Sequence, residues 1–146
     1  MDTLELERAI GQDPWAEEQF SGVYPRDRLP KTVRYPCAMI LNTDPASEPG
    51  VHWVAVYFAE DDKGEYFDSY GLQPPPCFEQ YMKKHSVQWT WNKTQLQEVW
   101  TSACGHFCVY YVIYRCRDIP MKDITDHLMA IEHNDTYVME VVDALL

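Results

Sequence analysis

Cys104 is the residue whose type and position most directly suggest covalent chemistry. It lies in Thr101-Ser-Ala-Cys-Gly-His-Phe107, where Thr101 and Ser102 are capping residue types ahead of an apolar run. The unpaired N–H groups and the dipole at a helix N-terminus favour the thiolate of a cysteine placed there. Gly105 beside it would let a substrate backbone approach the sulfur closely. The alternative is a buried cysteine that acts as a small hydrophobic residue. We interpret three other cysteines, Cys37, Cys108 and Cys116, as such buried hydrophobic residues.

His52 and Asp68 are candidates for the base and for the acid that orients it. A cysteine nucleophile needs a base, and His52 stands at the start of an expected strand, from which its side chain can reach the rim of a sheet. Asp68 lies near the end of the returning strand, so a hairpin brings both residues to one edge. There Asp68 could accept the second N–H of His52. The alternatives are a surface or structural histidine and a solvated carboxylate at a strand end.

The register of this hairpin decides whether the two side chains can meet. Residues that face each other across an antiparallel pair project to the same side. A three-residue loop with Glu60 opposite Gly64 places Asp68 opposite Val56, about four residues or roughly 13 Å short of His52. A bulge or bend in the returning strand must then close the gap. A two-residue loop would put the side chains on opposite faces, and the sequence leaves the register open.

A third requirement is a hydrogen-bond donor for the oxyanion of a tetrahedral intermediate. Two amide side chains, Gln95 and Gln97, precede Cys104 and could act with the Cys104 N–H. The alternative is that both are polar loop residues.

The elements that must position these residues form an α+β arrangement, a small sheet packed among helices. A chain of 146 residues with 46% apolar residues is long enough for one compact domain, residues 1–146, and too short for two ordinary ones. Four prolines exclude helix between residues 11 and 36. The pattern predicts helices over 3–10, 78–85, 104–116, 121–131 and 137–145, and strands over 37–42, 51–58, 65–68 and 87–91.

Composition and charge exclude several classes of function. The net charge of −11 disfavours nucleic-acid binding through net charge. The longest apolar run, residues 107–114, is eight residues, far below the roughly 20 that a membrane span needs. No charged-then-apolar leader opens the chain, and five cysteines follow no secreted pattern, so we expect free thiols in a reducing intracellular compartment.

In order and spacing, these residues resemble the adenovirus protease (adenain) family, whose clan also contains the SUMO proteases. The matching motifs are Gly50-Val-His-Trp-Val-Ala55, Tyr66-Phe-Asp-Ser-Tyr-Gly71, and Gln97 with Ser102-Ala-Cys-Gly-His-Phe-Cys108. The likeness extends to Phe20–Tyr24 and Cys37–Thr43, and so covers most of residues 4–116.

The resemblance implies a role for each matching position. It implies an adenain-like protease fold with Cys104 as nucleophile, His52 as general base and then acid, and Asp68 as the orienting acid. Gln97 is preferred to Gln95 for the oxyanion hole because it stands seven residues before the cysteine. Trp53 would flank the substrate cleft, and its alternative is an ordinary core aromatic residue.

The sequence also departs from the adenovirus enzymes. Asp68 stands where they carry glutamate, whereas SUMO proteases carry aspartate. The adenovirus enzymes bind a capsid-derived peptide through a disulfide to a cysteine between the acid and the nucleophile, and use DNA as a second cofactor. Residues 78–96 contain no cysteine and the net charge is −11, so the sequence disfavours a disulfide-linked peptide and DNA as cofactors, while an activating peptide bound without a disulfide stays open. The compact pattern is similar to proteases of Polinton or Maverick elements and of integrated adenovirus-like viruses.

The resemblance therefore implies an endopeptidase for virion or element-encoded precursor proteins. It implies cleavage at glycine-containing sites, in the host nucleus or the virion, with no metal or other cofactor. One alternative is an isopeptidase that removes ubiquitin-like modifiers, and another is a catalytically silent binding module of the same fold. A zinc site of Cys104, His106, Cys108 and Cys116 is disfavoured, because ligands at that helical spacing do not converge on a point.

Overall fold

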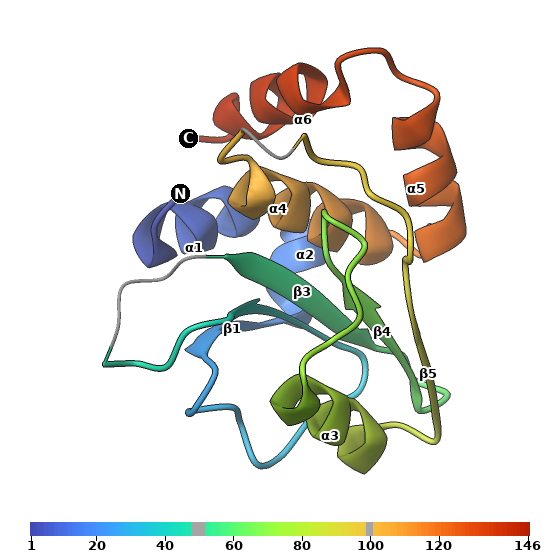
Figure 1. Ribbon diagram of the computed structural model, residues 1–146. Helices are drawn as coiled ribbons and strands as arrows, with labels where there is room; N and C mark the ends of the chain where they lie inside the picture. The colour runs from blue at the N-terminus through green and yellow to red at the C-terminus, as the bar shows by residue number, and fades with distance from the viewer. Residues whose placement is uncertain (48–51, 99–100) are drawn as a thin grey trace.

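The computed structural model describes residues 1–47, 52–98 and 101–146 (Figure 1). Gly50 and Val51, within one of the motifs above, lie outside the described residues. The helices are α1 (Thr3–Gly11), α2 (Pro14–Gln19), α3 (Pro76–His85), α4 (Cys104–Arg115), α5 (Met121–Met129) and α6 (Asn134–Asp143). The strands are β1 (Phe20–Pro25), β2 (Cys37–Asn42), β3 (Trp53–Phe58), β4 (Lys63–Phe67) and β5 (Gln88–Trp91).

The five strands form one mixed sheet in the order β1-β2-β3-β4-β5. The central pairs β2–β3 and β3–β4 are antiparallel, and the outer pairs β1–β2 and β4–β5 are parallel. All of β2 and nearly all of β3 are buried, because both faces of the sheet centre are covered. The predicted α+β fold and the predicted hairpin of β3 and β4 are confirmed.

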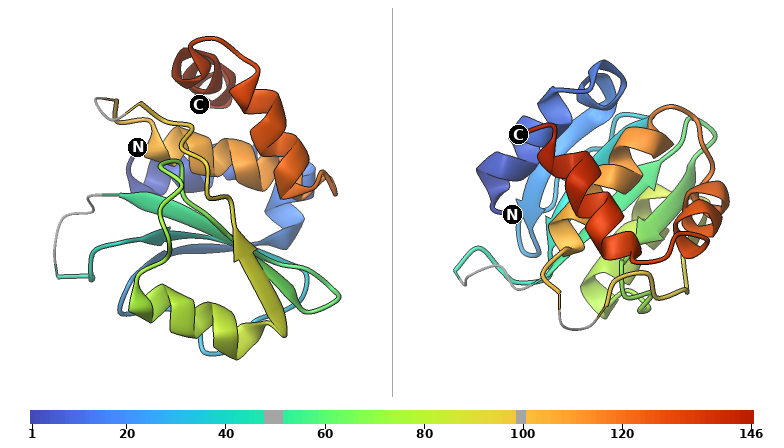
Figure 2. Two further views of the ribbon diagram at one scale, coloured as in Figure 1. Left: turned by 45° about the vertical axis from the view of Figure 1, so that its right-hand side comes forward. Right: turned by 90° about the horizontal axis from the view of Figure 1, so that it is seen from above.

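Helices cover both faces of the sheet (Figures 1 and 2). α4 lies over β3 and α6 packs on the outer side of α4, whereas α3 covers the opposite face alone. Nine consecutive residues of α4, 105–113, are buried, as expected for a helix enclosed between a sheet and other helices. The side chains alternate along the strands, so Ala55 faces α4 and Val56 faces α3. α4 therefore holds its first residue, Cys104, on a rigid support.

Two elements near the N-terminus differ from the prediction. α2 and β1 lie in the segment from which the prolines were expected to exclude helix. Pro14 is the first residue of α2, where a missing N–H costs nothing, and Asp13 caps the helix by accepting from Ala16 N at 2.9 Å. α1 is capped by Asp2, whose side chain accepts from the N–H of Glu5 while the Glu5 side chain accepts from the N–H of Asp2.

The hairpin register also differs from the loop that we considered. Phe58 pairs with Gly64 and Ala55 pairs with Phe67. Continuing this ladder places Asp68 opposite Val54, two residues from His52 and on the same face. The gap to be closed is therefore half as long as a pairing of Glu60 with Gly64 would leave.

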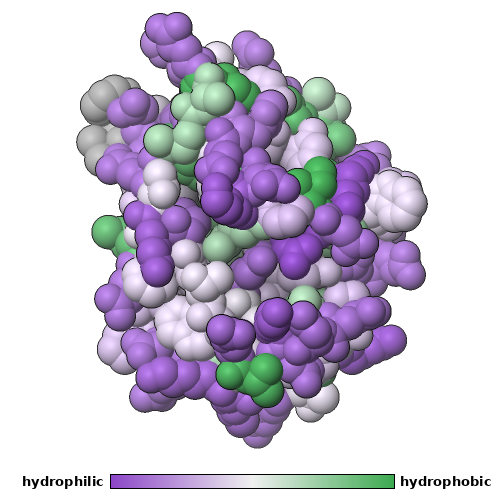
Figure 3. Space-filling model, turned by 90° about the vertical axis from the view of Figure 1, so that its right-hand side faces the viewer, coloured by the Kyte–Doolittle hydropathy of each residue, from purple (hydrophilic) through white to green (hydrophobic). Residues whose placement is uncertain are grey.

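No described helix is both long enough and apolar enough to cross a bilayer. Figure 3 shows a mostly hydrophilic face on which apolar side chains are scattered in small groups. Such scattered groups are normal on a globular domain.

Candidate active site

His52 and Asp68 meet just beyond the ends of two paired strands. His52 directly precedes β3 and Asp68 directly follows β4. The Nε2 atom of His52 lies 2.8 Å from Oδ1 of Asp68, and Asp68 is 4% exposed. Beyond β4 the chain bends, with Gly71 N donating to Asp68 O at 2.7 Å. His52 and Asp68 are two residues apart in the strand register. This bend, together with a diagonal contact from His52 across the strand ends, brings their side chains together.

Two residues that the sequence analysis missed hold this pair in place. Asn92, just after β5, accepts from the Asp68 N–H at 3.0 Å and donates to the Asp68 carbonyl at 2.7 Å. Tyr70 donates its N–H to Oδ1 of Asp68 at 2.9 Å, and its ring stacks on His52 at 4.9 Å. Tyr70 stands in the motif that contains the acid, which is the signal that could have identified it. Asn92 has no local signal, because it acts across 24 residues of chain.

Cys104 is the first residue of α4, and no side chain caps this helix. Ala103 occupies the cap position, so the capping expected from Thr101 or Ser102 is wrong. The hydroxyl of Thr101 is engaged by Asp135 instead. The N–H groups of the first turn are therefore left free of a capping side chain, as an anion at this point requires.

The pKa values of Cys104 and His52 move toward each other. Burial is the largest influence on Cys104 and raises its pKa. It is outweighed by a hydrogen bond with His52, by the backbone amides of Trp53 and Gly105 and by the charge of His52, so that the pKa is lowered. For His52 burial lowers the pKa, but hydrogen bonds and charge from Asp68 and Cys104 raise it to about 9. The two shifts together favour a thiolate–imidazolium pair at neutral pH.

The other cysteines do not share this environment. All five cysteines are free thiols. Burial raises the pKa of Cys37 and Cys108, and raises that of Cys116 to about 12. These three are buried, in agreement with their interpretation as small hydrophobic residues.

Gln97 is buried in the loop before Cys104, whereas Gln95 is exposed. The Oε1 atom of Gln97 accepts from Ser69 Oγ at 2.6 Å, and its Nε2 donates to the carbonyl of Thr101 at 2.8 Å. Gln95 supports this arrangement by donating to the Gln97 carbonyl at 3.0 Å. Gln97 is thus held in a fixed orientation beside the strand end that carries Asp68. Its role in an oxyanion hole stays a prediction.

Gly105 and Trp53 belong to the packing between α1 and α4. Trp53 donates its indole N–H to the carbonyl of Met1 at 2.9 Å. A Cβ on Gly105 would lie 3.2 Å from Met1 Cβ and 3.3 Å from Trp53 Cδ1. Gly105 is buried, and its small size admits Met1 and Trp53. Its expected place next to a substrate backbone stays a prediction.

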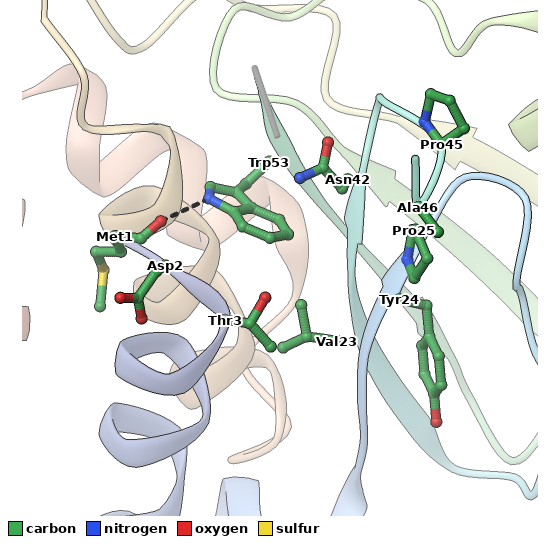
Figure 4. Close-up of a pocket in the computed structure, with 10 residues that line it drawn as sticks. All are labelled: Met1, Asp2, Thr3, Val23, Tyr24, Pro25, Asn42, Pro45, Ala46 and Trp53. Atoms are coloured by element: carbon green, nitrogen blue, oxygen red, sulfur yellow. Dashed lines mark hydrogen bonds between the residues drawn. The ribbon is translucent and has the colours of Figure 1, made fainter. Parts of the chain in front are cut away.

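Trp53, the residue after His52, also lines a pocket of about 420 Å³ (Figure 4). The start of α1 forms one wall, and the ends of β1 and β2 with the loop after β2 form the other. The predicted place of Trp53 next to a substrate cleft is compatible with this position and stays a prediction.

The residues considered for zinc do not gather around one point. His106 points its Nε2 toward Asp143 on α6, at 2.8 Å from Oδ1. Within residues 1–47, 52–98 and 101–146, no group of three or more His, Cys, Asp and Glu side chains could hold a metal ion.

Comparison with known proteins was made by sequence and by fold. No protein-family model matches the chain. The cysteine protease of African swine fever virus is 31% identical over 106 residues, which are 61% of this chain and 38% of the viral protein. The chain thus spans well under half the length of this relative.

Two solved structures share the fold. A crystal structure of the African swine fever virus protease matches with a TM-score of 0.65 at 20% identity, over 94% of this chain and 64% of the viral one. The SUMO protease Ulp1 matches with a TM-score of 0.51 at 12% identity, over all of this chain and 79% of the other. The chain thus shares the fold of these two cysteine proteases and is similar in sequence to the viral enzyme.

Proposed function

We propose that the protein is a cysteine endopeptidase that works through Cys104, His52 and Asp68. The observation that carries this proposal is the lowered pKa of the Cys104 thiol, next to a histidine whose other side is bound to a buried carboxylate. A thiolate kept at neutral pH beside a protonated imidazole is the resting state that thiol-dependent acyl transfer requires.

The reaction follows from these positions. The thiolate of Cys104 attacks the carbonyl carbon of a peptide bond and forms a tetrahedral oxyanion. His52 then gives its proton to the leaving amine, the C–N bond breaks, and a thioester joins the acyl group to Cys104. Neutral His52 next takes a proton from water, which attacks the thioester and releases the acid and the thiol. Asp68 keeps the imidazole oriented throughout and stabilises its charge.

Gln97 and the N–H of Cys104 are the donors that we assign to the oxyanion. An amide nitrogen carries two N–H groups, and we assign one of those on Gln97 to the carbonyl and hydroxyl oxygens of Thr101, which both lie within hydrogen-bond distance of this nitrogen. The second is the group that would meet the developing charge.

The substrate is proposed to be a polypeptide, with glycine near the cleaved bond as in the family that the motifs resemble. The likeness to a viral cysteine protease favours precursor proteins of a virus or of an integrated element as targets. The pocket lined by Trp53, the residue after the proposed catalytic histidine, is large enough to accept a side chain of such a substrate. Five free thiols agree with action in a reducing compartment.

The first test measures the thiol itself. Iodoacetamide at neutral pH should label Cys104 faster than the buried Cys108, and His52→Ala should slow the labelling of Cys104. A fluorogenic glycine-containing peptide should be hydrolysed by the wild type and not by Cys104→Ala. Equal labelling of Cys104 and Cys108 would contradict the enzyme and favour a silent binding module.

The second test separates the endopeptidase from an isopeptidase, whose fold the SUMO protease represents. The glycine-containing peptide is compared with fluorogenic SUMO and ubiquitin substrates at equal concentration. Preference for the peptide supports the endopeptidase. Preference for a modifier would replace it by the isopeptidase, with the same catalytic residues.

A further inference from the structure

A carboxylate on α6 reaches the loop that carries Gln97. Asp135 lies in the first turn of α6 and is 6% exposed. Its two oxygens accept from the N–H of Glu98 at 3.3 and 3.2 Å, and Oδ2 also accepts a hydrogen bond from the hydroxyl of Thr101. Asp135 thus ties α6 to the segment between Gln97 and Cys104, across 34 residues of chain.

Thr101 extends this contact to the side chain of Gln97. The carbonyl of Thr101 accepts from Gln97 Nε2 at 2.8 Å, and its hydroxyl oxygen lies 3.3 Å from the same nitrogen. At the other end of the amide, Ser69 donates to Oε1 at 2.6 Å. The amide is therefore fixed at both ends, on the oxygen side by the residue after Asp68 and on the nitrogen side by Thr101.

The single proton of the Thr101 hydroxyl explains why a carboxylate is needed. Two acceptors lie near this hydroxyl, the carbonyl of Glu98 at 3.1 Å and the carboxylate of Asp135. A hydrogen bond to a charged acceptor is about twice as strong as one to a neutral acceptor, so the proton is directed to Asp135. The lone pairs of the hydroxyl oxygen are then left to face the amide nitrogen of Gln97.

We propose that Asp135 and Thr101 are positioning residues for Gln97, so that α6 contributes to catalysis without touching the substrate. This inference rests on the proposed function and on the assignment of Gln97 to the oxyanion. An oxyanion donor acts only when its N–H is preorganised at the place where the charge develops. Freeing the nitrogen side of the amide from its restraints would therefore slow acylation and leave the thiolate intact.

Two reagents separate these effects. Acylation by p-nitrophenyl acetate passes through a tetrahedral oxyanion, whereas alkylation by iodoacetamide displaces iodide at a saturated carbon and forms no oxyanion. Asp135→Asn removes the negative charge that directs the Thr101 proton away from the carbonyl of Glu98, and leaves one acceptor oxygen for the Glu98 N–H and the Thr101 hydroxyl together. We expect it to lower the acylation rate of Cys104 by about 10- to 100-fold and to leave the alkylation rate unchanged.

A double-mutant cycle tests whether Asp135 acts through Gln97. Gln97→Ala should lower acylation by roughly 10²- to 10³-fold, and adding Asp135→Asn to it should cause no further loss. Glu140→Gln is the matched control, because it removes a negative charge from an exposed position of the same helix. It should change neither rate.

Thr101 supplies a second pair of variants if Asp135→Asn does not fold. Thr101→Ser keeps the hydroxyl and should retain acylation, whereas Thr101→Val loses it and should behave as Asp135→Asn does. The inference is overturned if Asp135→Asn slows both reactions equally, slows neither, or causes a further loss in Gln97→Ala. Wild-type acylation that is abolished in Cys104→Ala would still support the proposed function in each of these cases. Absence of wild-type acylation and of rapid alkylation would instead overturn the function itself.

Discussion

Asp68→Asn isolates the charge of the acid from its geometry. Oδ1 of Asp68 accepts from both His52 Nε2 and the N–H of Tyr70. The Tyr70 N–H should hold the carbonyl oxygen of an asparagine in the same place, because it requires an acceptor there. The variant would then keep the hydrogen bond to His52 and lose only the negative charge.

The magnitude follows from the shifted pKa of His52. A rise from 6.5 to about 9 corresponds to ~3 kcal/mol of stabilisation of the imidazolium. Asp68 raises this pKa through both its hydrogen bond and its charge. A hydrogen bond to a charged acceptor is about twice as strong as one to a neutral acceptor, so loss of the charge should remove ~1.5 kcal/mol, or about tenfold in the protonation equilibrium. Without that charge the pKa of His52 falls. The pKa of Cys104 then rises, because His52 loses its proton at a lower pH and no longer stabilises the thiolate with a positive charge.

These pKa shifts determine the direction of the pH effect at both the acidic and the alkaline limit of the pH range in which the ion pair exists. The thiolate–imidazolium pair exists above the lowered pKa of Cys104 and is lost as the pH rises through that of His52. In Asp68→Asn this window narrows from both sides. At pH 6 we expect the alkylation of Cys104 to be about tenfold slower than in the wild type. The increase of the alkylation rate with pH should begin at a higher pH.

The assay is the rate of iodoacetamide labelling of Cys104, followed by mass spectrometry between about pH 5 and pH 10. The control is Asp143→Asn, because His106 and Asp143 form a second pair at the same 2.8 Å, also beside α4. That pair does not contact Cys104, so its profile should match the wild type. An Asp68→Asn profile that overlays the wild type, or an Asp143→Asn profile that shifts as far, would refute the reasoning.

Three further predictions concern the support of this pair. Tyr70→Phe keeps the ring that stacks on His52 at 4.9 Å and should retain p-nitrophenyl acetate acylation. Tyr70→Ala should lower that rate by about tenfold through a less constrained imidazole. Asn92→Ala removes both side-chain hydrogen bonds to the Asp68 backbone, and should reduce acylation while leaving far-UV circular dichroism unchanged. Gly71 has φ +71° and an added Cβ would lie 2.6 Å from the backbone of Thr94, so Gly71→Ala should destabilise the fold by ~2 kcal/mol. Gly11→Ala, where a Cβ meets nothing within 4 Å, should not lower the melting temperature.

The parts of the fold that could be predicted are those with strong local patterns. The apolar run after Cys104 predicts α4 nearly to the residue, and the alternating segments around residues 51–68 predict the hairpin. β1 was missed because its strand conformation depends on pairing with β2, which lies beyond the proline-rich loop. The sequence does not predict α2, because prolines argue against helix in this segment. Pro14 stands in the first turn of α2, and the first turn is the part of a helix that tolerates proline.

The candidate site, too, could be predicted only where local sequence patterns mark its residues. The sequence predicts the elements next to His52, Asp68 and Cys104, because each of these residues adjoins or begins a strand or helix, whereas Gln97 lies in the loop before α4. The sequence does not provide the register, which is set by a turn in which Asp62 has φ 63°. Nor does it indicate Asn92 or Asp135, because these residues act across 24 and 34 residues of chain and nothing in their neighbourhood marks them.

The two His–Asp pairs beside α4 show why position decides the chemistry. Both have the same 2.8 Å separation, but the side chain of Asp68 is 5% exposed and that of Asp143 is 56% exposed. Water screens the second pair, whereas the first lies in a low-dielectric site and adjoins a thiol at a helix N-terminus without a side-chain cap. Asn92 after β5, Ser69 after β4 and Asp135 on α6 each fix one part of that site. Because these supports come from separate elements, the proposed catalytic geometry forms only when the whole fold has formed, and it is then in place before any substrate arrives.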